Sequence, residues 1–368
     1  DEAIAELNKK HYDLIIIMLG IANANPVTFC KQIKNDFPYI PIYLLLNNHN
    51  ELPIVKKNDE YIRFIDKIFI WNGDPKVFFA MIKNLEDKIN LDNDTKIGLV
   101  RIILLVEDSE QYYSKYLPLL YSIVLEQTKH LIEEITSDEL YKILRLRARP
   151  KILHVQSFED AVDILDNYAD NMLCLISDIR FFKGNTLNNN AGISLVKYAR
   201  NKIKELPIIL QSSDSSHAEK AYELKVTFID KNSQSLSQDI KSFINHYLGF
   251  GKFIYKNSDN QIIAEATSLK EFEKLLHTIP DDSLIYHGKR NHFSLWLMAR
   301  GEIQAAKIIH PAKVSDFNTP TELRQYLIDT IRKYRNEQNK GKVINYDEAA
   351  ITDESNIVSL SSGSLGGK

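Results

Sequence analysis

The sequence predicts an α/β protein with two doubly wound, five-stranded parallel sheets in tandem, the first copy truncated, and a mainly helical module after them. Three observations predict this class. Short apolar runs rich in β-branched residues alternate with amphipathic helical patterns over residues 1–248, which is typical of parallel βαβ units. The order of these segments in 1–95 recurs in fuller form in 99–248. Helical spacing dominates over 249–345.

The first copy, residues 1–95, contains three predicted strands and two predicted helices. The strand-like runs are "YDLIIIML" (12–19), "PIYLLL" and "KIFIWNG", and the helical runs are "PVTFCKQIKNDF" and "PKVFFAMIKNLEDKI". A complete domain of this kind would open with a further strand, helix and strand. We therefore expect an N-terminal truncation of this copy.

The second copy, residues 99–248, contains five predicted strands and five predicted helices. The strands are "GLVRIILLVED", "PKILHV", "MLCLISD", "LPIILQSS" and "VTFIDK". An insertion, "KHLIEEITSDELYKILRLRAR", follows the first helix, and a long loop containing "NTLNNNAG" follows the third strand. We expect both segments to lie beside the carboxyl ends of the strands.

The third module, residues 249–345, is predicted to be mainly helical. Thr267–Ser268 before "LKEFEKLL" and Thr319–Pro320–Thr321 before "ELRQYL" are typical helix starts. Residues 346–368 are polar and rich in glycine and serine, and we expect them to be a linker.

Composition and charge exclude several classes of function. The net charge of −3 gives no basic field for nucleic-acid binding. The two cysteines, Cys30 and Cys174, lie in apolar runs and exclude a disulfide framework. No apolar run approaches the roughly 20 residues of a membrane span, and the N-terminus lacks a signal-peptide pattern. We expect a cytoplasmic protein.

Polar residues follow several strands of the second copy at the point where each strand ends. The first strand ends in Glu107 and Asp108, the third in Asp178, the fourth in Ser212 and the fifth in Lys231. The carboxyl ends of strands in a doubly wound sheet converge on one edge, so these groups are expected to share a pocket. Clustered carboxylates need a cation, and oxygen ligands suit Mg²⁺. We expect Glu107, Asp108 and Asp178 to be its ligands.

A carboxylate in such a pocket can attack phosphorus and form an aspartyl phosphate. Asp178 is the candidate acceptor, with Lys231 stabilising charge on the transferred oxygens and Ser212 donating a hydrogen bond to them. The alternative is structural, because acids and serines often cap helices just after strands. Any one of these residues taken alone favours that reading.

This set of residues resembles that of response-regulator receiver domains. Phe228, three residues before Lys231, matches the aromatic side chain that rotates when such domains switch. The resemblance implies a sensor histidine kinase or a small-molecule phosphodonor as partner. Asn232 stands where the family usually has proline, so a cis peptide bond is not expected after Lys231.

The first copy lacks the groups for this chemistry. Aligning the strands places Met18 at the position of Asp178, Leu46 at that of Ser212 and Trp71 at that of Lys231. We expect this copy to be a degenerate receiver-like domain that serves packing or docking. A scaffold in which neither copy is phosphorylated remains the alternative for the whole region. A metabolic enzyme within 1–345 is disfavoured, because that part lacks a glycine-rich nucleotide loop.

The run "YHGKRNHFSLWLMARGE" (286–302) is the densest group of unusual residues. His287, His292 and His310 do not occur at i, i+4 on one helix face, which argues against a metal site. The helix is predicted to bury the apolar residues Phe293, Trp296, Leu297 and Ile303 in a core. Arg290, Arg300 and Glu302 are predicted to face solvent, with binding of a phosphate or a partner as the alternative role for the arginines.

The tail "SGSLGGK" resembles the opening of the ATP-binding domain of phosphoenolpyruvate synthases and pyruvate phosphate dikinases. The order of the modules and the pattern "RNHFSxWLxARGE" resemble the N-terminal regulatory region of a subgroup of these proteins. This implies a downstream ATP-binding phosphotransferase domain in the same polypeptide, with Lys368 contacting the nucleotide. The fragment itself is not expected to be catalytic. Its oligomeric state is left open, a homo-oligomer included.

Overall fold

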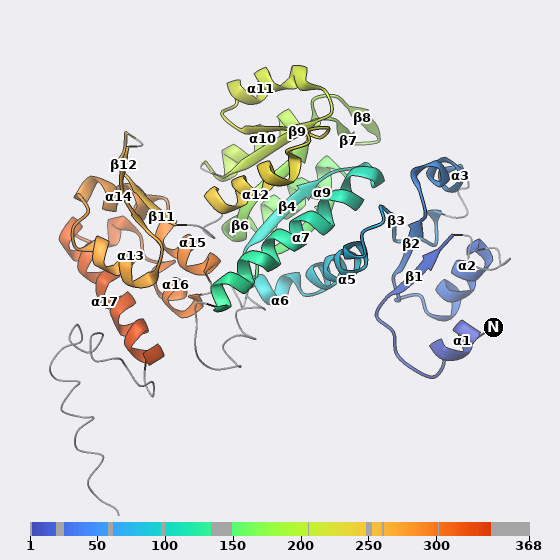
Figure 1. Cartoon of the computed structure of the whole chain (residues 1–368), viewed down its shortest axis with the longest axis horizontal. Coiled ribbons are helices and arrows are strands. Elements are labelled where there is room, and N and C mark those ends of the chain that lie inside the picture. The colour runs from blue at the N-terminus through green and yellow to red at the C-terminus, as the bar shows by residue number, and fades with distance from the viewer. Residues whose placement is uncertain are drawn as a thin grey trace, which may run out of the picture. The chain divides into compact units, whose positions relative to one another are not determined.

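The computed structural model describes residues 2–19, 26–57, 62–96, 100–133, 149–204, 206–247, 252–259, 261–300 and 302–339. The chain divides into two compact units, residues 1–251 with 295–303 and residues 252–294 with 304–368. Most of the predicted insertion at 129–149, and the whole of the predicted linker 346–368, lie outside the described residues. Figure 1 shows the elements of both units.

The N-terminal part of the first unit contains a three-stranded parallel sheet with the order β1-β2-β3. Its strands are β1 (Ile15–Met18), β2 (Ile42–Leu46) and β3 (Lys67–Ile70). These are the three strands that the sequence predicts, each trimmed to its apolar centre. The accompanying helices are α1 (Glu2–Leu7), α2 (Pro26–Asp36), the 3-10 turn η1 (His49–Glu51), α3 (Leu52–Lys56), α5 (Lys76–Ile89) and α6 (Leu91–Lys96).

A five-stranded parallel sheet with the order β10-β9-β6-β4-β5 forms the rest of the first unit. Its strands are β4 (Ile102–Val106), β5 (Lys151–Val155), β6 (Met172–Asp178), β9 (Ile208–Ser212) and β10 (Thr227–Asp230). All five were predicted, so α/β architecture with a parallel sheet is confirmed. Its helices are α7 (Glu110–Glu133), α9 (Phe158–Asn167), α10 (Ala191–Lys202), α11 (Ala218–Glu223) and α12 (Leu236–Tyr247), with 3-10 turns η2 (Ala169–Asn171) and η3 (Ser215–His217).

Helices cover both faces of this sheet, as the alternation of β4 shows. Ile103 and Leu105 belong to the core that contains α7 and α12, whereas Leu104 belongs to the core that contains α9, α10 and α11. Successive residues of a strand point to opposite faces, so a continuous apolar run such as "IILLV" is needed when both faces are buried. Both predicted free cysteines are buried, Cys174 in the middle of β6.

Helix α7 packs against both sheets of the first unit. The hydroxyl of Tyr113 donates to the carbonyl of Ile68, and the hydroxyl of Ser114 accepts the backbone N–H of Ile70 at 3.0 Å. Both partners lie on β3, one of the two edge strands of the small sheet. The side chains that lie between the two sheets form one apolar cluster with residues of both. The small sheet is therefore part of the same core and not an independent layer.

A buried ion pair fixes α5 to the five-stranded sheet. Asp87 on α5 is fully buried and binds the guanidinium of Arg149 at 2.6 and 3.1 Å. The same carboxylate accepts the hydroxyl of Tyr121 and the backbone N–H of Ile152, each at 2.9 Å. Because removal of one partner would leave an uncompensated charge in the core, this arrangement requires the two segments to be folded together.

A β-hairpin that the sequence analysis did not predict follows β6. Strands β7 (Phe181–Lys183) and β8 (Thr186–Asn188) pair antiparallel around Gly184, which has a φ of +61°. Only a long loop is predicted here from the sequence. The hairpin packs on α9 and α10, at the carboxyl end of the sheet, where the candidate acceptor lies.

The second unit contains a hairpin and several helices. Strands β11 (Phe253–Lys256) and β12 (Ile262–Ala266) pair antiparallel. The helices are α13 (Leu269–Leu276), α14 (Asp281–Lys289), the beginning of α15 (His292–Ala299), most of α16 (Ile303–Ile309), the 3-10 turn η4 (Val314–Asp316) and α17 (Pro320–Asn339). The prediction of a helical region is confirmed, but it missed the hairpin.

The two predicted helix starts of this unit are confirmed. The hydroxyl of Ser268 accepts the N–H of Glu271 and caps α13, and the hydroxyl of Thr319 accepts the N–H of Glu322 at the start of α17. Each N-cap satisfies a backbone donor that has no partner inside the helix.

Two residues of "LMARGE" were wrongly predicted to face solvent. Arg300 and Glu302 are both buried, while Arg290 is half-buried with its guanidinium 4.1 Å from the ring centre of Tyr286. The guanidinium of Arg300 lies 4.9 Å from the ring centre of Trp296, one helical turn earlier. An arginine that stacks on a buried indole can be buried with it. The predicted core residues Phe293, Trp296 and Leu297 are buried.

Two buried histidines form a hydrogen-bonded pair in the second unit. Nε2 of His287 accepts the backbone N–H of Lys256 at 2.8 Å, so its proton is on Nδ1, which lies 3.0 Å from Nδ1 of His292. Burial lowers the pKa of His287 to about 3 and that of His292 to about 4. Both rings are therefore neutral at physiological pH.

This pair predicts acid-sensitive stability. Unfolding returns each histidine to a pKa of about 6.5, so the unfolded state binds more protons below that pH. The contribution of the pair to the free energy of unfolding should have its full value above about pH 6.5. This free energy should fall as the pH drops towards about 4, by at most roughly 1.4 kcal/mol per pH unit for each ring. Urea unfolding between pH 7 and 4.5 measures the slope.

The variant His287→Gln should show a shallower slope than the wild type over this range, whatever its absolute stability. His11→Gln is the matched control, because the His11 side chain is 83% exposed. Identical slopes for His287→Gln and the wild type would contradict the role of the pair.

Candidate functional site

The polar residues that follow the strands of the five-stranded sheet meet at its carboxyl edge. Asp178 and Ser212 are the last residues of β6 and β9, and Glu107 and Lys231 come directly after β4 and β10. The N–H of Lys231 donates to the carbonyl of Ser212 at 2.9 Å, which continues the pairing of β10 with β9 by one residue. Short apolar strands that stop at a polar residue thus deliver each group to the same edge.

The ammonium of Lys231 joins two carboxylates from different strands. Its Nζ lies 2.6 Å from Oε2 of Glu107 and 2.7 Å from Oδ2 of Asp178. The lysine is buried, and its Nζ also lies 4.2 Å from the ring centre of Tyr112 on α7. The other oxygen of Asp178 accepts the N–H of Ile179 at 2.7 Å. The acceptor candidate is therefore held at both oxygens.

The acids of the site carry more charge than one ammonium balances. Burial raises the pKa of Glu107 to about 8, despite the opposing effect of Lys231 and with a further upward contribution from Asp178. Burial and the charge of Asp178 also raise the pKa of Asp108, to about 6. Burial alone would lower the pKa of Lys231, but the two carboxylates outweigh it and the net shift is upward. Lys231 is therefore charged, and the acids around it favour the binding of a second cation.

Glu107, Asp108 and Asp178 could hold that cation. One ligand oxygen from each lies within 4.8 Å of the others. The donor set is oxygen only and anionic, which suits a hard divalent ion such as Mg²⁺. The predicted metal ligands are thus brought together, and the raised pKa values of Glu107 and Asp108 are those of a site that a cation would complete.

The two remaining predicted site residues lie on β9, which neighbours β6, and on β10, the edge strand beside β9. The hydroxyl of Ser212 is buried and accepts the N–H of Asp214 at 3.1 Å. Phe228, in β10, is half-buried and packs against the core on the side of α9 to α11. The peptide bond between Lys231 and Asn232 is trans, as predicted, since the described residues contain no cis bond.

Sequence reasoning missed four residues around the site. The amide of Gln211, beside Asp178 in the sheet register, donates weakly to Glu107 at 3.5 Å. Tyr112 and Tyr116 stack on α7, and His217 approaches Ser212 at 3.2 Å. Gln211, a polar residue directly after the apolar run "IIL", was the one sequence signal that could have identified an additional site residue.

Two buried groups near these acids have no hydrogen-bond partner in the described part of the chain: the hydroxyl of Tyr116 and Oε1 of Gln211. Burial raises the pKa of Tyr116, and the charges of Glu107 and Asp178 raise it further.

The small sheet repeats the backbone of the site without its chemistry. The N–H of Trp71 donates to the carbonyl of Leu46 at 2.8 Å, as Lys231 does to Ser212. Met18 pairs with Leu45 in the register in which Asp178 pairs with Gln211. Met18, Leu46 and Trp71 thus have the backbone pairing in the small sheet that Asp178, Ser212 and Lys231 have in the larger one. None of the three side chains in the small sheet can accept a phosphoryl group.

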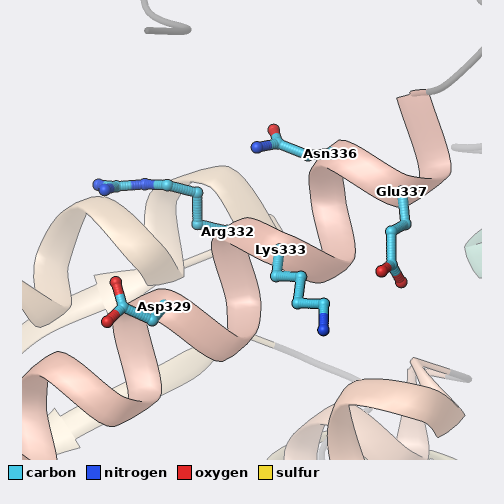
Figure 2. Close-up of a pocket in the computed structure, with 5 residues that line it drawn as sticks. All are labelled: Asp329, Arg332, Lys333, Asn336 and Glu337. Carbon is cyan, nitrogen blue, oxygen red and sulfur yellow. The ribbon is translucent and has the colours of Figure 1, made fainter.

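The other candidates of the sequence analysis do not form a comparable site. His310 contacts Asn291 through Nδ1 at 2.6 Å, while His287 and His292 contact each other. Lys368 lies outside the described residues. A pocket on the second unit is lined by Asp329, Arg332, Lys333, Asn336 and Glu337, all of α17 (Figure 2). Because one helix supplies every lining residue, this is a hollow along its surface, and Arg332 also pairs with Glu273.

Comparison with known proteins finds no match of the chain to a protein-family model or to a curated protein. The strand order β10-β9-β6-β4-β5 and the buried acidic group are consistent with a flavodoxin-like or receiver-like fold. Among the helices that the structure describes, none has the length and apolar character needed to cross a membrane.

Gly192, at the start of α10, lets the helix approach the carboxyl end of β6. Its N–H donates to the carbonyl of Ile179 at 2.9 Å. A Cβ at this position would lie 2.2 Å from the carbonyl oxygen of Asp178 and 2.8 Å from Cα of Ile179. Backbone atoms cannot yield as a side chain can, so only glycine fits without moving the acceptor segment.

Gly192→Ala should therefore destabilise the fold by about 1–3 kcal/mol, the usual effect of overpacking. Urea unfolding followed by circular dichroism measures this. Gly184→Asn is the control, because the hairpin turn has open space around Gly184 and asparagine tolerates its positive φ. A Gly192→Ala variant as stable as the control would contradict the close approach.

Proposed function

We propose that residues 99–248 act as a response-regulator receiver domain that accepts a phosphoryl group on Asp178. The observation that carries the proposal is the ammonium of Lys231 between Glu107 and Asp178, inside a group of three carboxylates at the carboxyl edge of a parallel sheet. A structural capping role would explain each acid singly. It gives no reason for three acids from the ends of β4 and β6 to share one pocket with a buried lysine from the end of β10.

The chain's own residues supply the parts of the transfer. An oxygen of Asp178 attacks the phosphorus of the donor, and the bond between phosphorus and the donor atom breaks with its electron pair leaving on the donor. Lys231, already 2.7 Å from Asp178, would stabilise the oxygens of the transferred group. Mg²⁺ held by Glu107, Asp108 and Asp178 would neutralise part of the charge that develops on those oxygens.

We further propose that the small sheet is a degenerate receiver-like domain and that the region regulates a downstream phosphotransferase domain related to phosphoenolpyruvate synthases. The apolar residues at the three equivalent positions support the first part. The second part depends on the sequence patterns "RNHFSxWLxARGE" and "GGK". A sensor histidine kinase or a small molecule such as acetyl phosphate would be the phosphodonor.

Incubation with acetyl phosphate and Mg²⁺ tests the acceptor. The intact mass should rise by one phosphoryl group in the wild type and in Asp163→Asn, which changes an exposed acid on α9. It should not rise in Asp178→Asn. Omission of Mg²⁺ should abolish the gain.

The absence of any gain in the folded wild type would contradict the proposal and would favour a scaffold of unphosphorylated receiver-like folds. A gain that persists in Asp178→Asn would show that another residue is the acceptor.

A further inference from the structure

Two nitrogen atoms of the turn that follows β9 lie within hydrogen-bond distance of the Ser212 hydroxyl. The backbone N–H of Asp214 donates to it at 3.1 Å, and Nδ1 of His217 lies 3.2 Å away. The turn is held in place by Asp214, whose Oδ1 accepts the N–H of Ser216 at 2.9 Å. Asp214 thereby caps η3, the turn that carries His217.

The surroundings of His217 decide which of its ring nitrogens carries the proton. Three oxygens face Nδ1: Oγ of Ser212 at 3.2 Å, the carbonyl of Asp214 at 3.3 Å and Oδ2 of Asp214 at 3.9 Å. A carbonyl and a carboxylate only accept hydrogen bonds, so a lone pair on Nδ1 would face two further lone pairs. The proton is therefore on Nδ1, and His217 is a donor to this group of oxygens.

This assignment determines what the hydroxyl of Ser212 can still do. A hydroxyl has one hydrogen to donate and two lone pairs to accept. The N–H of Asp214 and Nδ1–H of His217 occupy the lone pairs, which leaves the hydroxyl hydrogen as the remaining capacity. Ser212 follows Gln211, the sheet partner of Asp178. An oxyanion bound at Asp178 is the acceptor that this hydrogen would fit.

We infer that His217 is a positioning residue for Ser212: it fills an acceptor site of the hydroxyl, so that the hydroxyl hydrogen is kept for an oxyanion on Asp178. This rests on the proposed phosphoacceptor function. Without His217, the hydroxyl would have a free lone pair and several equivalent orientations, and part of its contribution to anion binding would be lost.

The test is the affinity of the full chain for beryllofluoride in the presence of Mg²⁺, measured by calorimetry. His217→Ala should weaken binding about twofold to tenfold, the effect of one net hydrogen bond. His217→Asn should restore most of the affinity, because its amide nitrogen can stand where Nδ1 stands. His49→Ala, at an exposed site, is the control and should leave the affinity unchanged.

A double-mutant cycle with Ser212→Ala separates positioning from a merely structural effect. In that background His217→Ala should have no further effect on affinity. Tighter binding by His217→Ala would mean that the ring holds the hydroxyl hydrogen itself, and would overturn the inference. An equal loss in both backgrounds, or no rescue by asparagine, would also overturn it. If the wild type binds no beryllofluoride, the proposed function fails together with the inference.

Discussion

The site depends on the ion pairs that the ammonium of Lys231 forms with Glu107 and Asp178. The ammonium is buried and is shared by two carboxylates, those of Glu107 and Asp178, which lie at the ends of two other strands. Glu107 precedes Lys231 by 124 residues in the sequence. A charge in such a place is tolerated only when its partners are present with good geometry. The β10, β6 and β4 ends must therefore reach the same edge in register. The burial of Lys231 with both carboxylates thus depends on the strand order that brings these three strand ends together.

The small sheet has the same backbone pairing at its carboxyl edge but no buried charge at the equivalent positions, all of which the structure describes. Its backbone hydrogen bonds at Trp71 and Leu46 are those of Lys231 and Ser212, yet apolar side chains occupy the positions of the polar ones. Its edge strand is instead bonded to α7, the helix whose first turn supplies Tyr112 to the site. The same helix thus contacts the polar edge of one sheet and the apolar core of the other. The small sheet and the carboxyl edge of the larger sheet are therefore linked through one helix.

The strands and the acids could be predicted from sequence because both leave local signals. A continuous apolar run that ends in a polar residue identifies a buried parallel strand together with the group at its end, as in "MLCLISD". His217 leaves no such signal, because its role arises from a turn that folds it back over five residues onto Ser212. The hairpin β7–β8 was missed because three-residue strands lie below the length at which alternation is informative. Arg300 was misplaced because its burial depends on stacking with Trp296, which periodicity does not register.

The central claim is that Asp178 is the residue that carries the phosphoryl group. Reduction with borohydride after treatment with acetyl phosphate and Mg²⁺ tests it most directly, because an aspartyl phosphate is reduced to homoserine, which stays in the chain. Peptide mapping by mass spectrometry should find homoserine at position 178 and aspartate unchanged at Asp108 and Asp214. Homoserine at another position, or none in a folded sample, would contradict the account.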